Sequence, residues 1–256
     1  MNYGQTKVVL CEDARQLGDR AAQDVATALA DVLKTKPRAC VILAAGESQN
    51  TFLPALAKRK EIDWSRVVGF AQDEFWDPKM DRRFTCEYQI RSQLTDQVHP
   101  HAVHFLDCNA ADPEAEARRF EKLLRDTGPI DVVCAGVGTS GHIAMNEPGV
   151  SPFDEPRWTK VVELVEQSKK QLRADPNFKA LGYIPEKGIT LTLPAMMSGK
   201  RIISMVPLAL KRDIITRLFA CQRADESFPA SILFKTPSML YLDRDSCPAH
   251  LISTKS

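Results

Sequence analysis

Short apolar runs alternate along this chain with longer segments in which apolar residues recur at helical spacing. The runs predicted as strands are residues 7–10, 39–45, 66–71, 102–106, 130–136, 189–193, 202–206 and 239–243. The segments predicted as helices are 12–34, one from about Ser48, 84–94, 112–128, a polar stretch at 160–173, and 208–220. Apolar strands between helices are typical of a parallel sheet that is buried on both faces. The sequence therefore predicts an α/β fold with a doubly wound, mostly parallel, Rossmann-like sheet and helices on both faces.

The length of the chain is sufficient for one large domain. Its 256 residues contain no repeat and no long linker, so we expect a single α/β domain over residues 1–256. The region 150–188 is polar and irregular and interrupts the alternation with Pro152, Pro156, Pro176 and Pro185. Such a segment is typical of a lid or an excursion over a binding site.

The charge balance argues against two classes of partner. Lys and Arg number 34 against 33 Asp and Glu, a net charge of +1, so neither nucleic acid nor an anionic membrane is expected as the main partner. Seven scattered cysteines without a C-x-x-C pair favour a reducing cytoplasm. No apolar stretch reaches the roughly 20 residues needed to cross a bilayer. A small molecule is the expected partner, and homo-oligomer formation stays open.

Polar clusters follow three of the predicted strands. They are AAGES after 39–45, AQDEF after 66–70 and GVGTSGH after 130–135. Because ligands of doubly wound sheets bind beyond the carboxyl ends of the strands, these clusters predict an active site at that edge.

The stretch VGTSGHIAMNEPG (137–149) permits four interpretations. A serine-nucleophile elbow fails because His142 stands where G-x-S-x-G needs its second glycine. A metal site lacks a second ligand at ligand spacing, and a dinucleotide loop lacks the full glycine spacing. The fourth is a glycine-rich loop that presents His142 as an acid–base group, with Glu147 nearby to hold the imidazole. Taken alone, the stretch fits a plain loop with a capping histidine equally well.

Residues in three other segments suit a site for a phosphorylated ligand. Gly46 and Ser48 follow a strand and open a helix, where free N–H groups can bind a phosphate. Asp73 follows another strand directly, where burial can raise its pKa and make it a proton-transfer base. Lys211 opens a later helix and suits a phosphate clamp. Each pattern also fits an ordinary turn, cap or exposed cation.

Taken together, these segments resemble the glucosamine-6-phosphate deaminase/isomerase family, in order over nearly the whole chain. The matching segments are GHIAMNEPG (141–149), the most specific, and VVGFAQDEF (67–75), VILAAGES (41–48) and PASILFKTPSMLYLD (229–243). The resemblance implies a sugar-phosphate enzyme without metal or redox cofactor. Such an enzyme converts glucosamine 6-phosphate, or galactosamine 6-phosphate, to the ketose 6-phosphate and ammonia.

The resemblance also implies the acid–base groups. Asp73 would move a proton between C2 and C1, His142 would open the sugar ring, and Glu147 would support His142. Ser140 departs from the family, whose loop carries an aspartate at this catalytic position. Since a hydroxyl stabilises an imidazolium less than a carboxylate does, we expect ring opening to be slower or differently assisted.

The phosphate would be held by Gly46, by the backbone of Glu47 and by Ser48, with Lys211 closing on it. The negative side chain of Glu47 must then point away from the anion. The family's arginine near 165–175 has no clear counterpart, because Arg173 is only the nearest residue of that type.

Two alternatives stay open. The related 6-phosphogluconolactonases share the sheet and a Gly-His loop, and the position of Lys211 is slightly closer to theirs, whereas Asn146-Glu147-Pro148-Gly149 favours the deaminases. A non-catalytic sugar-phosphate sensor would retain the pocket alone, but the presence of both Asp73 and His142 argues against it.

Overall fold

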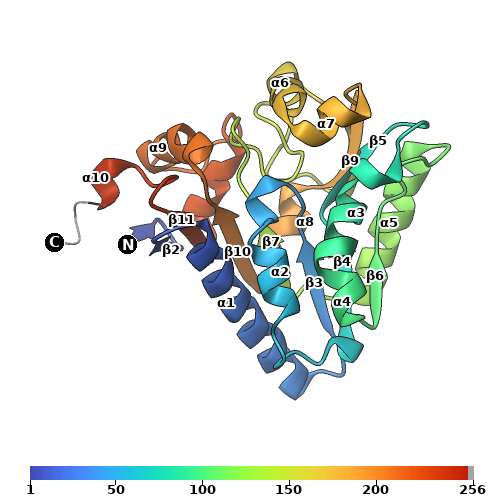
Figure 1. Cartoon of the computed structure of the whole chain (residues 1–256), viewed down its shortest axis with the longest axis horizontal. Helices are drawn as coiled ribbons and strands as arrows, with labels where there is room; N and C mark the ends of the chain where they lie inside the picture. Colours follow the sequence, from blue (N-terminus) through green and yellow to red (C-terminus); the bar gives the residue numbers. More distant parts are fainter. Residues whose placement is uncertain (253–256) are drawn as a thin grey trace.

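Parallel pairing dominates the central sheet. The computed structural model describes residues 1–252, and its main sheet has the strand order β1-β2-β11-β10-β7-β3-β4-β6 (Figure 1). These strands are β1 (Asn2–Tyr3), β2 (Thr6–Cys11), β3 (Ala39–Leu43), β4 (Val67–Ala71), β6 (Ala102–His104), β7 (Val132–Ala135), β10 (Arg201–Val206) and β11 (Ser238–Asp243). Strand β1 pairs antiparallel with β2, and every other neighbouring pair of this sheet is parallel. The predicted doubly wound, mostly parallel sheet is confirmed.

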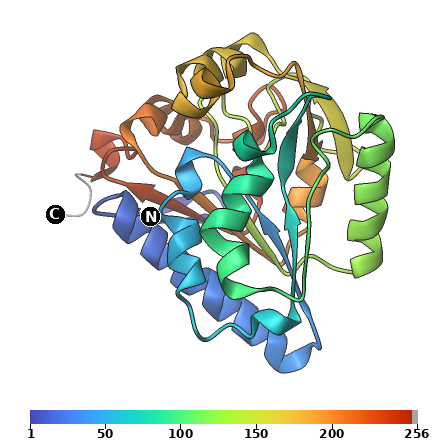
Figure 2. The same cartoon turned by 45° about the vertical axis from the view of Figure 1, so that its right-hand side comes forward.

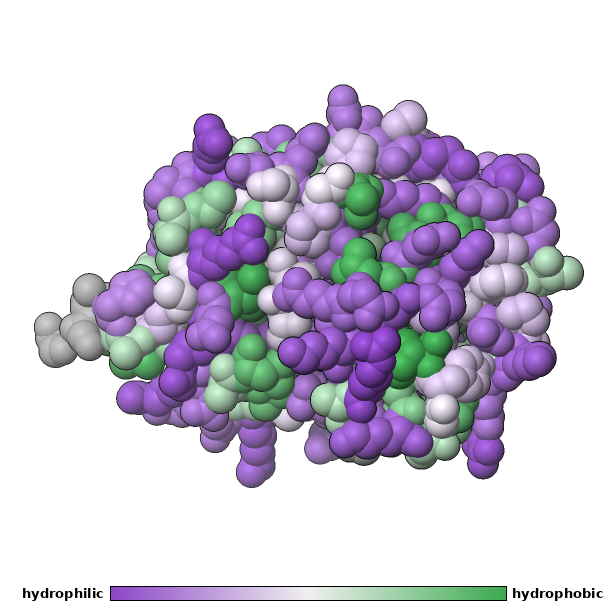
Figure 3. Space-filling model, turned by 90° about the horizontal axis from the view of Figure 1, so that it is seen from above, coloured by the Kyte–Doolittle hydropathy of each residue, from purple (hydrophilic) through white to green (hydrophobic). Residues whose placement is uncertain are grey.

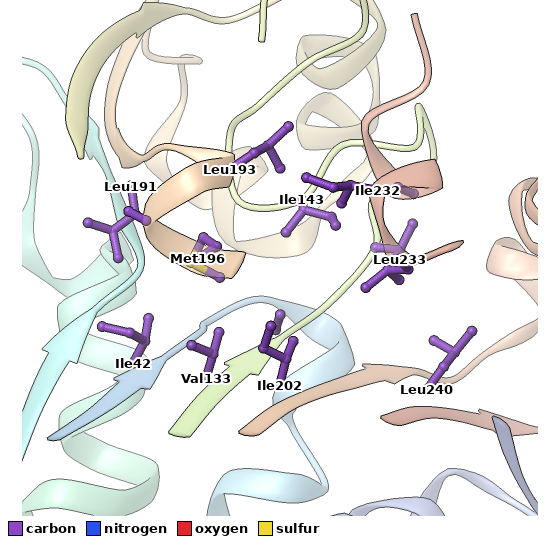
Figure 4. Packing of buried hydrophobic residues seen from close by; sticks show 14 of the residues in the cluster. Ile42, Val133, Ile143, Leu191, Leu193, Met196, Ile202, Ile232, Leu233 and Leu240 are labelled. Atoms are coloured by element: carbon purple, nitrogen blue, oxygen red, sulfur yellow. The ribbon is translucent and has the colours of Figure 1, made fainter. Parts of the chain in front are cut away.

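Alternate residues of these strands face two separate cores, because successive side chains of a strand point to opposite faces. On one face, Ile42, Val133, Ile202 and Leu240 form a row across four strands, and α8 (Leu193–Met197) lies over the Ile42 and Val133 end of that row, as Figure 4 shows. The helices on the other face are α1 (Ala14–Thr35), α2 (Phe52–Ala57), α3 (Cys86–Ile90) and α4 (Asp96–Val98). Figure 2 shows them side by side along the sheet. Helices therefore cover both faces, as the apolar strands require.

The helix α5 (Pro113–Thr127) begins where its local sequence predicts. The side chain of Asp112 accepts a hydrogen bond from Glu114 N at 2.9 Å, and Pro113 occupies the first turn. The helix ends at Gly128, whose φ of 103° lies in the region that favours glycine. Local chemistry alone is sufficient to define these two ends.

A second, smaller sheet was not expected from the sequence. It contains β5 (Asp73–Trp76), β9 (Lys187–Leu191) and β8 (Thr159–Glu163), all antiparallel. The prediction of a helix from residue 160 is wrong for its first part, since β8 comes first and α6 (Glu166–Ala174) follows. The β-branched residues of β8 pair with β9 and pack near α5, so tertiary contacts override the helical pattern.

The segments α6 and α7 (Pro176–Leu181) lie together beyond the sheet, at the top of Figure 1. Figure 3, seen from that side, shows mainly hydrophilic residues with small, separate apolar groups. The lid at 150–188 and the single-domain organisation stay predictions. Among residues 1–252, no helix is long and apolar enough to cross a membrane.

Candidate active site

The predicted site residues meet at a small cavity of about 140 Å³ at the carboxyl edge of the main sheet. The cavity wall includes Gly46, Glu47, Ser48, Asp73, His142 and Lys211. A second cavity of about 140 Å³ shares Asp73 and His142 with the first and extends to Glu147. Ser140 lines neither cavity but contacts His142 from behind. Segments far apart in the sequence therefore converge on one place.

His142 is held by two side chains through the same ring nitrogen. Its Nδ1 lies 2.7 Å from Ser140 Oγ and 3.0 Å from Glu147 Oε1. Ser140 in turn donates to Glu147 Oε2 at 2.6 Å, so its oxygen is an acceptor toward the imidazole. This arrangement places the Nδ1 proton on the Ser140–Glu147 side and leaves Nε2 for proton exchange with a ligand.

The contact with Glu147 corrects the expectation drawn from Ser140. Ser140 led us to expect a less stabilised imidazolium, but Glu147, five residues after His142, lies in contact with the ring as its sequence position suggested. Burial acts to raise the pKa of Glu147, yet its hydrogen bonds with His142 and Ser140 outweigh burial and lower that pKa. Glu147 is therefore an ionised partner for the imidazole at neutral pH.

Two glycines shape the loop around the histidine. A Cβ at Gly138 would lie 1.9 Å from His142 Nε2, so the ring rests directly on the backbone of that residue. Gly141 has a φ of 90°, and a Cβ there would lie 2.1 Å from the ring of Phe228. The glycine-rich sequence is thus required for the position of the imidazole.

Asp73 is a buried carboxylate that forms no ion pair with a Lys or Arg side chain among the described residues. Only 8% of its surface is exposed, and burial raises its pKa to about 6 despite the opposing charge of His142. Gln72 Nε2 lies 3.3 Å from Oδ2, and the Cys86 side chain also hydrogen-bonds with this carboxylate. A carboxylate with such a pKa suits proton transfer near neutral pH.

Glu74 follows Asp73 in β5 and therefore points to the opposite face of the strand. Its carboxylate accepts hydrogen bonds from the backbone of Phe75, Cys86 and Glu87 at 2.9–3.0 Å. Burial raises the pKa of Glu74 in spite of these donors. Glu74 joins α3 to β5 and so fixes the strand that carries Asp73. Successive side chains of the strand DEFW (73–76) point to opposite faces, and this alternation is the sequence signal that Asp73 and Glu74 have different surroundings.

The expected phosphate turn differs in detail from the prediction. A single 3₁₀ turn, η1 (Glu47–Gln49), follows β3, and α2 begins later, at Phe52. Gly46 has a φ of 96°, and its N–H donates to Gln89 Oε1 at 2.8 Å, so this N–H is not free for a ligand. The side chain of Glu47 is exposed, whereas Ser48 is buried. The N–H groups of Glu47 and Ser48 and the Ser48 hydroxyl are the donors this turn offers.

Lys211 supplies a cation at the same cavity. It ends η5 (Ala209–Lys211) after β10 and is only 5% exposed. Burial lowers its pKa to about 8, while the charge of Glu47 acts in the opposite direction. Arg173, by contrast, is exposed, lies 3.4 Å from Glu166 and lines neither cavity. Lys211 is therefore the cation available to an anionic ligand in these cavities.

Residues of α6 also contact the site, which the sequence did not indicate. Ser168 Oγ donates to Glu147 Oε1, and Gln171 Oε1 accepts from Thr139 Oγ1 at 2.7 Å. Gln171 lines both cavities. The helical spacing of Ser168 and Gln171 places them on one face, but their partners lie about 20 to 30 residues away in the sequence. Within residues 1–252, no group of three or more His, Cys, Asp or Glu side chains is arranged to hold a metal ion.

Comparison with known proteins decides the family. The model of glucosamine-6-phosphate isomerases/6-phosphogluconolactonase matches residues 12–241. This chain belongs to that family. It is 30% identical over 226 residues to a glucosamine-6-phosphate deaminase of Shouchella clausii, which covers 86% of this chain and 89% of the relative. It is 32% identical over 230 residues to glucosamine-6-phosphate deaminase 1 of Giardia intestinalis. This alignment covers 85% of this chain and 82% of the relative.

Solved structures show the same fold. A monomeric glucosamine-6-phosphate deaminase superposes with a TM-score of 0.81 at 26% identity, over 94% of this chain and 98% of that one. A 6-phosphogluconolactonase from Thermotoga maritima superposes with a TM-score of 0.72 at 18% identity, over 93% of this chain and 99% of that one. The predicted resemblance is confirmed at the level of the family, which comprises sugar-phosphate enzymes.

Proposed function

We propose that this protein is an amino-sugar 6-phosphate isomerase/deaminase that converts glucosamine 6-phosphate, or galactosamine 6-phosphate, to the ketose 6-phosphate and ammonia. The observation that carries the proposal is the convergence of Asp73, His142 and Lys211 on one cavity. The curated relatives named glucosamine-6-phosphate deaminases support the same choice.

The acid–base groups match the two proton transfers of this reaction. Protonated His142 gives a proton to the ring oxygen, which opens the sugar to its aldehyde form. Asp73 then takes the proton from C2 and returns it to C1, while the aldehyde oxygen takes up a proton from the ammonium on C2, which yields an alcohol at C1 and an iminium at C2. Water adds to that iminium, and the C–N bond breaks to release ammonia and the ketose. Glu147 stabilises the positive charge on His142 through the 3.0 Å contact.

The phosphate would anchor the sugar away from the reacting carbons. Glu47, Ser48 and Lys211 line a common cavity with Asp73, and their N–H and ammonium groups are the donors that would bind the phosphate. A remote anionic group of this kind supplies binding energy and orients C1 and C2 toward the carboxylate.

The test is to assay ammonia release and ketose-phosphate formation from glucosamine 6-phosphate and galactosamine 6-phosphate, with hydrolysis of 6-phosphogluconolactone in parallel. We expect ammonia and ketose phosphate in equal amounts. Lactone hydrolysis without ammonia release would replace the proposal with a lactonase. Binding of sugar phosphates without turnover would indicate a sensor.

A further inference from the structure

Gln72 occupies the junction between the two sheets, between the last residue of β4 and the first residue of β5. Its backbone N–H donates to Leu43 O of the main sheet at 2.9 Å, and its carbonyl accepts from Leu191 N of the second sheet at 2.9 Å. The backbone of Gln72 is therefore fixed on both sides. Its side chain is 5% exposed and lines the cavity with Asp73 and His142.

The two ends of the Gln72 amide have different surroundings. Nε2 lies 3.3 Å from Asp73 Oδ2. We assign the amide in this orientation because the flipped amide would place its oxygen against the carboxylate oxygen of Asp73. Oε1 is buried and accepts no hydrogen bond from the residues that the structure describes. A buried carbonyl oxygen without a donor costs free energy, and such an atom calls for an explanation.

The position of Gln72 next to Asp73 indicates which donor would satisfy this oxygen. This step rests on the proposed function, in which Asp73 contacts the hydrogen on C2 of the sugar. The amine sits on that same carbon, so it lies within reach of the side chain bonded to Asp73. A carbonyl oxygen beside a carboxylate favours a donor with positive charge, which an ammonium provides and a hydroxyl does not.

We propose that Gln72 is a specificity-determining residue, whose Nε2 holds Asp73 while its Oε1 accepts a hydrogen bond from the amine on C2 of the bound sugar phosphate. A site built around a hydrogen bond discriminates strongly against ligands that lack the donor. Gln72 thereby selects amino-sugar phosphates over sugar phosphates with oxygen or hydrogen at C2.

The experiment measures binding of three non-reacting ligands by calorimetry. They are glucitol 6-phosphates that carry an amine, a hydroxyl or a hydrogen at C2, and their reduced C1 prevents isomerisation. In the wild type, the amine ligand should bind most tightly. Gln72→Met, similar in length and without donor or acceptor, should weaken the amine ligand about tenfold and leave the ligand with hydrogen at C2 unchanged within error.

Two further variants separate recognition from support of the fold. Gln72→Glu keeps an acceptor oxygen and should restore the preference for the amine. Gln49→Met is the matched control, because Gln49 is also buried in the wall of this cavity with an unpartnered Oε1, but belongs to the phosphate turn. Any loss of affinity in Gln49→Met should be equal for all three ligands. Thermal unfolding checks that each variant is folded.

The outcomes distinguish this inference from the proposed function. If the wild type binds the three ligands and Gln72→Met weakens all of them equally, Gln72 only supports the fold and the inference is overturned alone. A Gln72→Glu variant without preference for the amine would overturn it as well. If the wild type binds none of the ligands, both the proposed function and the inference fail.

Discussion

The two edges of the central sheet each hold a buried aspartate, in contrasting surroundings. At the amino edge, Asp131 precedes β7, and its carboxylate lies 2.6 Å from Lys36 Nζ and 3.1 Å from Cys40 N. It lines a hollow of about 890 Å³. At the carboxyl edge, Asp73 lines cavities of about 140 Å³ and has a neutral amide as its partner.

The contrast shows that the partners of a buried acid indicate its role better than the size of the space beside it. Asp131 is matched by a cation and a backbone donor, which is the arrangement of a structural group. Asp73 forms no ion pair with a Lys or Arg among the described side chains, and burial raises its pKa to about 6. An acid in that state is available for proton transfer and costs stability while it is ionised.

The replacement Asp73→Asn should have the largest effect on activity. Loss of the base should lower kcat by about 10²–10⁴-fold, while binding of sugar phosphate changes little. Stability should increase at pH 7, because a raised pKa makes the ionised form unfavourable in the folded state. The stability that Asp73 contributes is present at low pH and is lost as pH rises through about 6. Turnover and urea unfolding check both effects, and a variant with normal turnover would show that Asp73 is not the base.

Glu147→Gln should have the next largest effect. The amide would place a donor or a neutral oxygen against Nδ1 of His142 and remove the negative charge that stabilises the imidazolium. We expect kcat to fall on the order of 10²-fold, with little change in the free energy of unfolding. Steady-state kinetics and calorimetry of ligand binding provide the measurement. Unchanged kcat would show that Ser140 is sufficient to orient the ring.

Asp131→Ala tests the opposite edge. The buried N–H of Cys40 loses its acceptor and Lys36 loses its ion pair, so the free energy of unfolding should fall by about 2 kcal/mol. The kcat/KM should stay at the wild-type value, since this edge takes no part in the proposed chemistry. Urea unfolding together with kinetics tests the prediction. A loss of activity without a loss of stability would contradict the division between the two edges.

The pH dependence gives the smallest and most specific effect. Asp73 must be ionised, so kcat/KM should fall about tenfold per pH unit below about 6. Lys211 must be charged to hold the phosphate, so kcat/KM should also decline above about 8. The variant Lys211→Met should bind weakly and lack the alkaline limb. An alkaline limb that persists in this variant would assign it to another group.

Much of the site was predictable from local sequence, although its contacts were not. Asp73 and His142 follow buried strands, and parallel strands bring their carboxyl ends to one edge. The hydrogen bond between Ser168 and Glu147 joins residues 21 positions apart, and the Gln72 amide oxygen lacks a partner because none of the described residues near it in space supplies a donor. The N–H of Gly46 was expected to be free, but Gln89, from a distant helix, occupies it.

The sequence by itself determined the main sheet and its helices, because apolar spacing and caps such as Asp112 act over a few residues. It also determined which polar residues stand at the carboxyl edge. The tertiary structure alone decided the second sheet, in which Asp73 pairs with Thr190 across more than a hundred residues. It also decided the pKa of Asp73 and the contacts that Ser168 and Gln72 make with the two catalytic carboxylates. These properties depend on burial and on the neighbours of each group in space, and no local pattern specifies either.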